Sequence, residues 1–193
     1  MKKAALEDKS LVVEMLALSF EKNQSVNYIA KQDNRRKQRI HALMEYSFEI
    51  CRQFGEVYIS DDWKACALVL YPDRKKTTFK TVWLSMKLIF QVIGISSIGK
   101  VMKREALIKE KQSQSNSPKY YLWFIGVDPV HQHEGIGTKL LLEVLADAKL
   151  QNRKVFLETS TVGNLLWYQR AGLQIYDILE LGYPLYFLNN LYS

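Results

Sequence analysis

Two glycines lie where a buried strand gives way to a helix, in a segment that could bind an anion. Gly135 and Gly137 follow Asp128-Pro129 and precede an amphipathic run that continues past Leu142. Glycine has no Cβ, so the backbone can approach a ligand closely. The first amides of a helix lack internal partners, and the helix dipole favours an anion beside them. The pattern indicates a phosphate- or pyrophosphate-binding loop, although an ordinary glycine-containing helix start has the same spacing.

Two widespread phosphate-binding patterns do not fit this loop. The pattern G-x-x-x-x-G-K-[ST] fails because Lys139 follows Gly135 too closely. The dinucleotide-binding pattern requires a third glycine at position 140, which is Leu140. What remains is the shorter pattern [QR]-x-x-G-x-[GA] after a strand that ends in V-x-P.

That shorter pattern resembles the acetyl-CoA-binding motif of the GNAT N-acetyltransferases. Val127-Asp128-Pro129 is followed by Gln132-x-x-Gly135-x-Gly137, with glutamine where the family more often has arginine. Downstream, 164–173 is similar to the family's second signature, an asparagine followed by Tyr-x-x-x-Gly-Phe, with Leu173 in the Phe position. A predicted strand at 155–159 separates the two motifs, in the family's order.

The resemblance implies acetyl transfer from acetyl-CoA, as cosubstrate, to an amine acceptor, without a metal. In the family, a bulge separates the central strand from its neighbour, and nearby backbone groups pair with the pantetheine arm. Gly126 fits a close backbone approach there. The residues that would contact the cofactor are Ile125, Gly126, Val127, Gln132, His133, Glu134, Gly135, Ile136, Gly137, Thr138 and Asn164.

Two residues are candidates for moving protons. Tyr168 matches the family tyrosine that protonates the leaving thiolate, and a phenol with a pKa of about 10 is protonated at neutral pH. Glu158 is the best candidate for a base that accepts the amine proton, directly or through water. A core role for Tyr168 and a structural hydrogen bond for Glu158 remain open. His131 and His133 have a spacing that could suggest a metal, but without a third nearby ligand a loop facing phosphate is favoured.

Composition predicts one folded unit in a reducing compartment. The 193 residues are enough for a single domain over 1–193, and 48% hydrophobic residues favour a globular chain. Cys51 and Cys66 form no disulfide framework, and the first ten residues lack the apolar core of a secretory signal. We therefore expect a cytoplasmic protein.

The net charge of +7 reflects three basic clusters, near 22–39, 74–80 and 100–111. Nucleic acid or an anionic membrane surface could bind such clusters. Solvated helix faces, together with attraction for the phosphates of coenzyme A, are favoured because no nucleic-acid-binding motif accompanies the charge. Nucleic acid is not expected as a partner, and a homodimer is possible.

Hydrophobic periodicity predicts strands and helices in an order close to the GNAT topology. The resemblance implies an α/β fold with a mixed, mostly antiparallel central sheet flanked by helices, and a helical insert precedes the central strand. The central strand, with Tyr120, Leu122 and Phe124 on one face, should be covered on both sides because both faces are apolar. The predicted helices are 7–20, 35–54, one starting near 137 and a short one after 164. The other predicted strands are 2–5, 55–60, 65–71, 154–159, 173–179 and 183–188.

The insert over about 78–111 is rich in apolar residues. Only 88–99 is free of charge, which is shorter than the about 18 residues of a membrane span, so no transmembrane segment is expected. Gly94 and Ser96-Ser97 predict a break between two helices. The pair could pack on the fold, form a lid over the acceptor pocket, or present an amphipathic surface helix. The polar segment at about 112–118 is predicted to be a mobile linker.

Three functions remain open. The leading one is an N-acetyltransferase acting on a primary amine of a small molecule or protein. The second is a non-catalytic acyl-CoA-binding sensor or regulatory module on the same fold, because no base is evident. The third is a basic protein that associates with membranes or nucleic acid. The acceptor pocket is expected from residues near 26–36 and 78–111.

Overall fold

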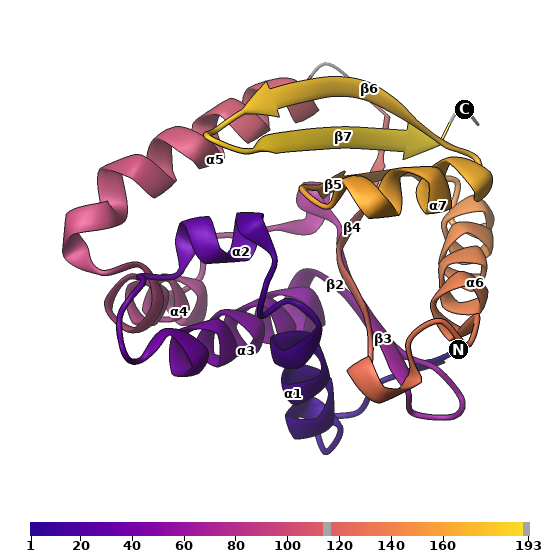
Figure 1. Ribbon diagram of the computed structural model, residues 1–193, viewed down its shortest axis with the longest axis horizontal. Coiled ribbons are helices and arrows are strands. Elements are labelled where there is room, and N and C mark those ends of the chain that lie inside the picture. The colour runs from indigo at the N-terminus through magenta and orange to yellow at the C-terminus, as the bar shows by residue number, and fades with distance from the viewer. Residues whose placement is uncertain (114–116, 191–193) are drawn as a thin grey trace.

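The computed structural model describes residues 1–113 and 117–190, and it contains a seven-stranded sheet in the order β1-β2-β3-β4-β5-β7-β6 (Figure 1). The strands are β1 (Lys2–Lys3), β2 (Gly55–Ile59), β3 (Ala65–Leu70), β4 (Lys119–Val127), β5 (Lys154–Thr159), β6 (Leu173–Glu180) and β7 (Pro184–Asn190). Among these residues β4 and β5 pair in parallel, and the other neighbours pair antiparallel. The predicted fold class, a mixed and mostly antiparallel sheet, is confirmed.

Helices cover both faces of the sheet. They are α1 (Lys9–Ser19), α2 (Gln24–Ile29), α3 (Arg36–Phe54), α4 (Phe79–Leu88), α5 (Ile98–Gln112), α6 (Ile136–Leu150) and α7 (Leu165–Arg170). One core forms where α1 and α3 pack on the sheet, and a second forms beneath α6. The central strand is therefore covered on both sides, as its apolar faces predicted. The helix α2 was not predicted, because six residues are too few for a periodic pattern.

The central strand does not alternate in the simple way that its sequence suggested. Leu68 of β3 pairs with Phe124 and Val69 pairs with Leu122, so Trp123 is an extra residue in β4. Tyr120 and Leu122 face α6, whereas Phe124 belongs to the core beneath α1 and α3. Grouping Phe124 with Tyr120 and Leu122 was wrong, because a β-bulge shifts the alternation by one residue.

The strands β4 and β5 pair over three residues and then separate. Their pairing runs from Lys119 with Lys154 to Tyr121 with Phe156. Beyond that point β5 continues through Glu158 and pairs with β7 on its other edge. The bulge at Trp123 increases the local twist just where the separation begins. The sheet is therefore open between the second half of β4 and the end of β5.

The insert forms a bent helical pair. The helix α4 continues into a π-helical turn at Ile89–Ile93, the chain turns at Gly94 with φ of 76°, and α5 follows a short 3-10 turn. The predicted break at Gly94 and Ser96-Ser97 is confirmed. The two halves, Phe79–Ile93 and Ile95–Gln112, are bent by 98°. Within the described residues no single helix meets the length and hydropathy of a membrane span, although this bent pair does when its halves are taken together.

The predicted linker at 112–118 lies partly outside the described residues. Gln112 is the last residue of α5, and Lys119 is the first of β4.

Candidate active site

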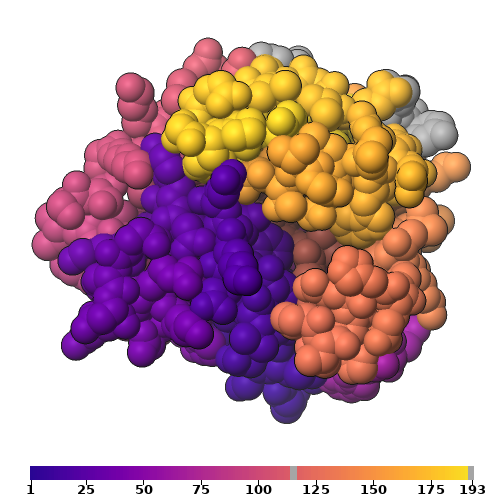
Figure 2. Space-filling model, in the orientation of Figure 1, coloured from indigo at the N-terminus to yellow at the C-terminus, as the bar shows by residue number. Residues whose placement is uncertain are grey.

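A cavity of about 990 Å³ lies where β4 and β5 separate. In Figure 2 the surface is hollowed between the indigo N-terminal half and the orange and yellow C-terminal half. Along β4 the cavity is lined by every residue from Tyr121 to Val127, and its far wall runs from Glu158 to Thr161. The glycine loop closes one end, and residues of α2 and α5 close the other. The cavity thus joins the predicted anion loop to the region where the acceptor pocket was expected.

The loop end of the cavity is shaped by two glycines. Gly135 caps α6 in the left-handed conformation, with φ of 81°, which favours glycine. At Gly137 a Cβ would lie 3.0 Å from Val127 Cγ2, so the helix packs closely on the end of β4. The first amides of α6 lack intrahelical partners, and no side chain caps the helix. This end of the cavity can therefore accept an anion through backbone N–H groups.

Gly126 also packs closely against α1. A Cβ at Gly126 would lie 2.9 Å from Leu16 Cδ2 and 3.2 Å from Ser19 Oγ, both on α1. The Ser19 hydroxyl donates to the carbonyl oxygen of Val127 at 2.7 Å. Gly126 thus permits the close approach of α1, and the Val127 carbonyl already has a donor. Both residues still line the cavity.

Tyr168 lies on α7 with its side chain buried against the cavity. It is 6% exposed, and burial raises the pKa of its phenol. The ring of Trp167 lies 4.6 Å away, and its indole N–H donates to Thr138 Oγ1 at 3.0 Å. That bond ties α7 to the first turn of α6. Asn164 precedes α7 and also lines the cavity.

Glu158 lies at the opposite end of the cavity and already has two donors. The Tyr121 hydroxyl donates to Oε2 at 2.5 Å, and Gln112 Nε2 donates to Oε1 at 2.7 Å. Burial raises the pKa of the Glu158 carboxyl, and the two donors oppose that effect by stabilising the charged form. A carboxyl whose pKa is raised in this way keeps its proton to a higher pH than an exposed glutamate does.

Arg104 is a buried cation in the wall of the same cavity. It is 7% exposed, its Nε donates to the Tyr183 hydroxyl at 3.2 Å, and its Nη2 donates to Ser25 Oγ at 2.5 Å. Its Nη1 pairs with Glu105. Arg104 therefore joins α5 to α2 and to the start of β7. The positive charge of Arg104 also lowers the pKa of the Glu158 carboxyl.

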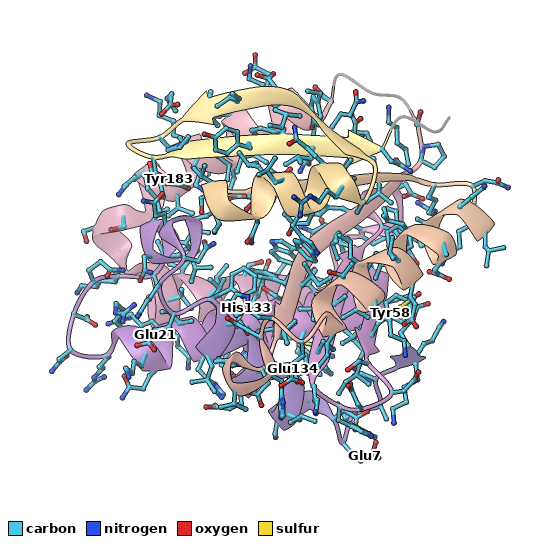
Figure 3. The ribbon with its side chains drawn as sticks, turned by 45° about the vertical axis from the view of Figure 1, so that its right-hand side comes forward. Glu7, Glu21, Tyr58, His133, Glu134 and Tyr183 are labelled. Carbon is cyan, nitrogen blue, oxygen red and sulfur yellow. The ribbon has the colours of Figure 1, made fainter. Side chains whose placement is uncertain are left out.

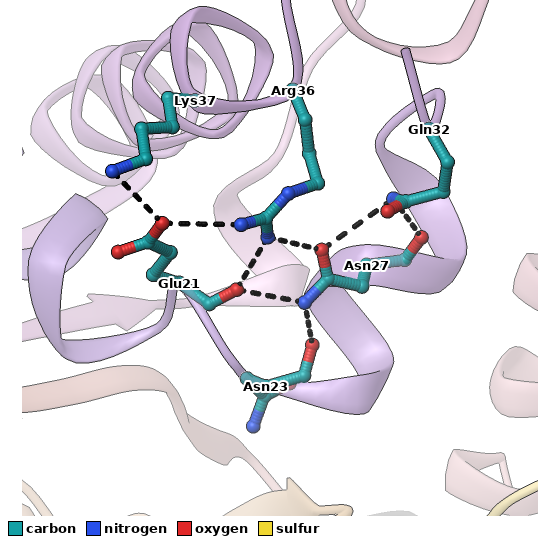
Figure 4. A network of polar contacts seen from close by, with 6 residues as sticks. All are labelled: Glu21, Asn23, Asn27, Gln32, Arg36 and Lys37. Carbon is teal, nitrogen blue, oxygen red and sulfur yellow. Dashed lines mark hydrogen bonds and ion pairs between the residues drawn. The ribbon is translucent and has the colours of Figure 1, made fainter. Parts of the chain in front are cut away.

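Polar contacts hold α2 in the wall (Figure 4). Arg36 Nη1 donates to the Glu21 carbonyl oxygen at 2.8 Å and to Asn27 Oδ1 at 2.9 Å, and Lys37 pairs with the Glu21 carboxylate. Asn23 caps α2 by accepting from the Val26 amide at 3.1 Å. These contacts fix the wall residues Val26 and Ile29.

The histidines of the loop do not assemble a metal site. His131 Nδ1 lies 3.1 Å from Glu134 Oε1, and Glu134 also lies 3.7 Å from Lys64 Nζ. His133 has φ of 67°, a left-handed conformation in the loop just before Gly135 (Figure 3). Across the described parts of the chain, no group of three or more His, Cys, Asp or Glu residues is arranged to hold a metal ion.

The cavity brings together most of the predicted site residues. Those that line it are Ile125, Gly126, Val127, Gln132, His133, Gly135, Gly137, Thr138, Glu158, Asn164 and Tyr168. Glu134 and Ile136 do not line it. Sequence reasoning missed Tyr121 and Arg104, the second of which was grouped with exposed basic residues. The spacing in the sequence could have indicated that Arg104 faces inward, because it shares a helix face with the apolar residues Val101 and Ile108.

Comparisons with known proteins agree with this fold. A model of the acetyltransferase (GNAT) family matches residues 61–172. A solved structure from Corynebacterium glutamicum, "histone acetyltransferase HPA2 and related acetyltransferase", is 16% identical with a TM-score of 0.72, covering 100% of this chain and 95% of that one. The C-terminal condensation domain of Ebony in complex with beta-alanyl-dopamine is 9% identical with a TM-score of 0.70, covering 98% and 96%. Mosquito arylalkylamine N-acetyltransferase like 5b is 13% identical with a TM-score of 0.55, covering 99% and 98%. At these identities the solved structures show a shared fold.

Proposed function

Because the chain belongs to the GNAT acetyltransferase family, we propose that it transfers an acetyl group from acetyl-CoA to a primary amine of a small molecule or protein. The observation that carries this proposal is the cavity that opens between β4 and β5. It has an anion-accepting helix start at one end and a partly buried carboxyl at the other. A long cosubstrate and a separate acceptor could therefore meet inside one cavity.

The loop end fits the pyrophosphate of coenzyme A. The amides of Ile136, Gly137 and Thr138 form the first turn of α6, where the helix dipole favours negative charge. The edge of β4 beyond Tyr121 lacks pairing with β5, which leaves room for an extended chain such as pantetheine. When bound, acetyl-CoA supplies the activated acetyl group as a thioester. Gln132, whose amide donates to the Val127 carbonyl at 3.4 Å, lies beside this end.

Tyr168 would hold the proton for the leaving sulfur. Burial raises the pKa of its phenol, so the hydroxyl keeps its proton at neutral pH. The side chain is fixed by its packing against Trp167 and faces the cavity between the loop end and the carboxyl end. A positioned phenol can give a proton to a thiolate formed beside it, although that transfer is uphill in water.

Glu158 would accept the proton of the attacking amine, directly or through water. Burial raises the pKa of its carboxyl, which brings a glutamate closer to the pKa expected of a base acting near neutral pH. The Tyr121 hydroxyl donates to this carboxylate beside the point where the two strands separate. The acceptor amine would enter between α2 and α5, beside Glu158 and Arg104.

A second candidate, a non-catalytic acyl-CoA-binding sensor, is favoured by one observation. Both oxygens of Glu158 already accept hydrogen bonds, from Tyr121 and from Gln112. A carboxyl held only for structure would look the same. In that case acyl-CoA would bind at the loop end and no acetyl group would be transferred.

Two measurements separate these possibilities. Acetyl-CoA at about 100 times its Kd should stabilise the fold by about 2.7 kcal/mol, read as a thermal shift. A screen of aliphatic amines, aromatic amines and lysine peptides then tests for release of free coenzyme A thiol. A shift without turnover supports the sensor, and no shift with saturating acetyl-CoA or coenzyme A contradicts both functions.

A further inference from the structure

The outer face of α4 and the turn after it carries large apolar side chains that no described part of the chain covers. We call these five residues the apolar stripe: Phe79, Val82, Trp83, Met86 and Phe90. Their exposed fractions are 91%, 47%, 55%, 52% and 61%. Their spacing places them along one side of a helix. A contiguous run of exposed aromatic and aliphatic side chains on a fixed helix marks an interaction surface.

The opposite side of the same helix is firmly packed. Thr81, Leu84, Val92 and Ile93 are buried. A reciprocal pair of hydrogen bonds between Thr78 and Thr81 caps the start of α4. Figure 1 places α4 at the edge of the molecule, where it packs against α3. The stripe is therefore held outward by the fold.

The charge around the stripe is positive. Residues 74–104 contain eight Lys or Arg residues and no Asp or Glu. Of these, Lys76, Lys80, Lys100 and Lys103 are exposed, Lys75 is exposed but also lines the large cavity, and Arg104 is buried. The two carboxylates that face α4 from α3 are paired, Glu49 with Lys80 at 3.1 Å and Glu45 with Lys87 at 3.5 Å. The groove between α3 and α4, of about 280 Å³, is lined by three lysines and two glutamates.

We propose that the apolar stripe docks α4 flat onto an anionic membrane surface. Aromatic side chains such as Phe79 and Trp83 would enter the boundary between headgroups and acyl chains, and the lysines around them would meet anionic headgroups. An anionic membrane is favoured over a second copy of the chain because its negative headgroups complement the lysines around the stripe. A two-fold contact through the stripe would bring identical lysine clusters together, and like charges repel.

The docked helix is continuous with the cavity wall. Leu88, at the end of α4, and Ile93, in the π-helical turn, both line the large cavity, as does Val101 on α5. Docking therefore places the acceptor end of the cavity close to the bilayer. This inference does not depend on acetyl transfer, because it concerns the outer face of the insert and not its inner face.

Co-sedimentation of the full chain with vesicles tests the proposal. We expect binding to phosphatidylcholine vesicles that contain phosphatidylglycerol, and binding roughly tenfold weaker to phosphatidylcholine alone. Added salt should weaken the first interaction. The Phe79→Ser/Trp83→Ser/Phe90→Ser variant should lose most of its binding, because it removes the largest side chains that enter the bilayer boundary. Lys76→Glu/Lys103→Glu should weaken the preference for phosphatidylglycerol.

A matched control replaces three leucines that are equally exposed on other helices, Leu142, Leu150 and Leu166, by serine. This control should bind vesicles like the parent chain. Thermal unfolding of each variant checks whether the fold persists. The proposal is overturned if the parent chain stays in the supernatant with anionic vesicles, or if both triple serine variants bind equally. It is also overturned if the parent chain is a dimer that the stripe variant converts to a monomer, because the stripe would then cover a second copy.

Discussion

The Tyr121 hydroxyl donates a hydrogen bond to Glu158 Oε2 at 2.5 Å. Tyr121 is the last residue of β4 that pairs with β5, and Glu158 lies in β5 beyond that pairing. The bond therefore joins the two strands just where the sheet opens. It also stabilises the charged form of a carboxyl that burial pushes toward neutrality.

Glu158 should make stability depend on pH. Burial raises the pKa of its carboxyl, so the folded protein keeps a proton that the unfolded chain releases. Stability should then fall as the pH rises from about 4.5 through the folded pKa, and level off above it. Glu158→Gln removes this titration. In differential scanning fluorimetry, the Tm of Glu158→Gln should therefore rise relative to the Tm of the parent as the pH increases from about 4.5 to the folded pKa of Glu158.

Tyr121→Phe is the companion variant. It keeps the carboxyl of Glu158 but removes a hydrogen-bond donor that stabilises its charged form, so the pKa of Glu158 in the folded protein should rise further. The pH range over which stability falls should then extend to higher pH. A Tm difference between Glu158→Gln and the parent that stays constant with pH would show that Glu158 does not titrate abnormally.

Tyr168→Phe should slow turnover without weakening acetyl-CoA. Removing the phenolic proton donor should lower kcat by roughly 10- to 100-fold, whereas the Kd for acetyl-CoA should change by about twofold or less. Steady-state kinetics and calorimetry measure the two quantities. Tyr71→Phe is the control, because Tyr71 is a fully buried tyrosine in the core beneath α6 and does not line the cavity. An unchanged kcat in Tyr168→Phe would contradict the proposed proton donor.

Arg104→Met should loosen α5. The change removes the donors to Ser25 and Tyr183 and leaves Glu105 without its partner. We expect a loss of about 1–3 kcal/mol in the free energy of unfolding and faster hydrogen exchange across α5. Lys103→Met makes the same change of charge at an exposed neighbour and should leave both quantities nearly unchanged. Equal exchange in the two variants would mean that Arg104 does not hold the helix.

Gly126→Ala should destabilise the protein through α1. The added methyl would lie 2.9 Å from Leu16 Cδ2, and Leu16 is fully buried. Overpacking of this kind costs about 1–3 kcal/mol. Gly99→Ala is the contrasting change, because nothing lies within 4 Å of its added methyl in α5. It should be neutral or stabilise by up to about 1 kcal/mol, as measured by denaturant midpoints.

The parts of the fold that follow local rules could be predicted from the sequence. The glycine loop before α6 needs a left-handed residue at Gly135, and α6 itself has a clear apolar period. The break of the insert at Gly94 is also local, because its positive φ favours glycine. These features depend on residues close together in the chain.

The parts that depend on distant contacts could not be predicted. Nothing in Tyr120–Phe124 distinguishes the bulged residue, because every neighbour of Trp123 is also apolar and the bulge is defined by pairing with Leu68 and Val69. The bond between Tyr121 and Glu158 depends in turn on how β4 and β5 separate. The contact of Gly126 with α1 could not be predicted for the same reason, since it spans more than a hundred residues of chain.

Because of the bulge at Trp123, the number of residues in β4 matters to the fold as much as the residue types do. On the Tyr120 side of the bulge even-numbered residues face α6, and on the Val127 side odd-numbered residues do. Deleting one residue there would exchange the inside and outside positions of one half of the strand. We therefore expect insertions and deletions in relatives to avoid this strand, whereas substitutions in its first half can diversify the acceptor end without disturbing the cofactor end.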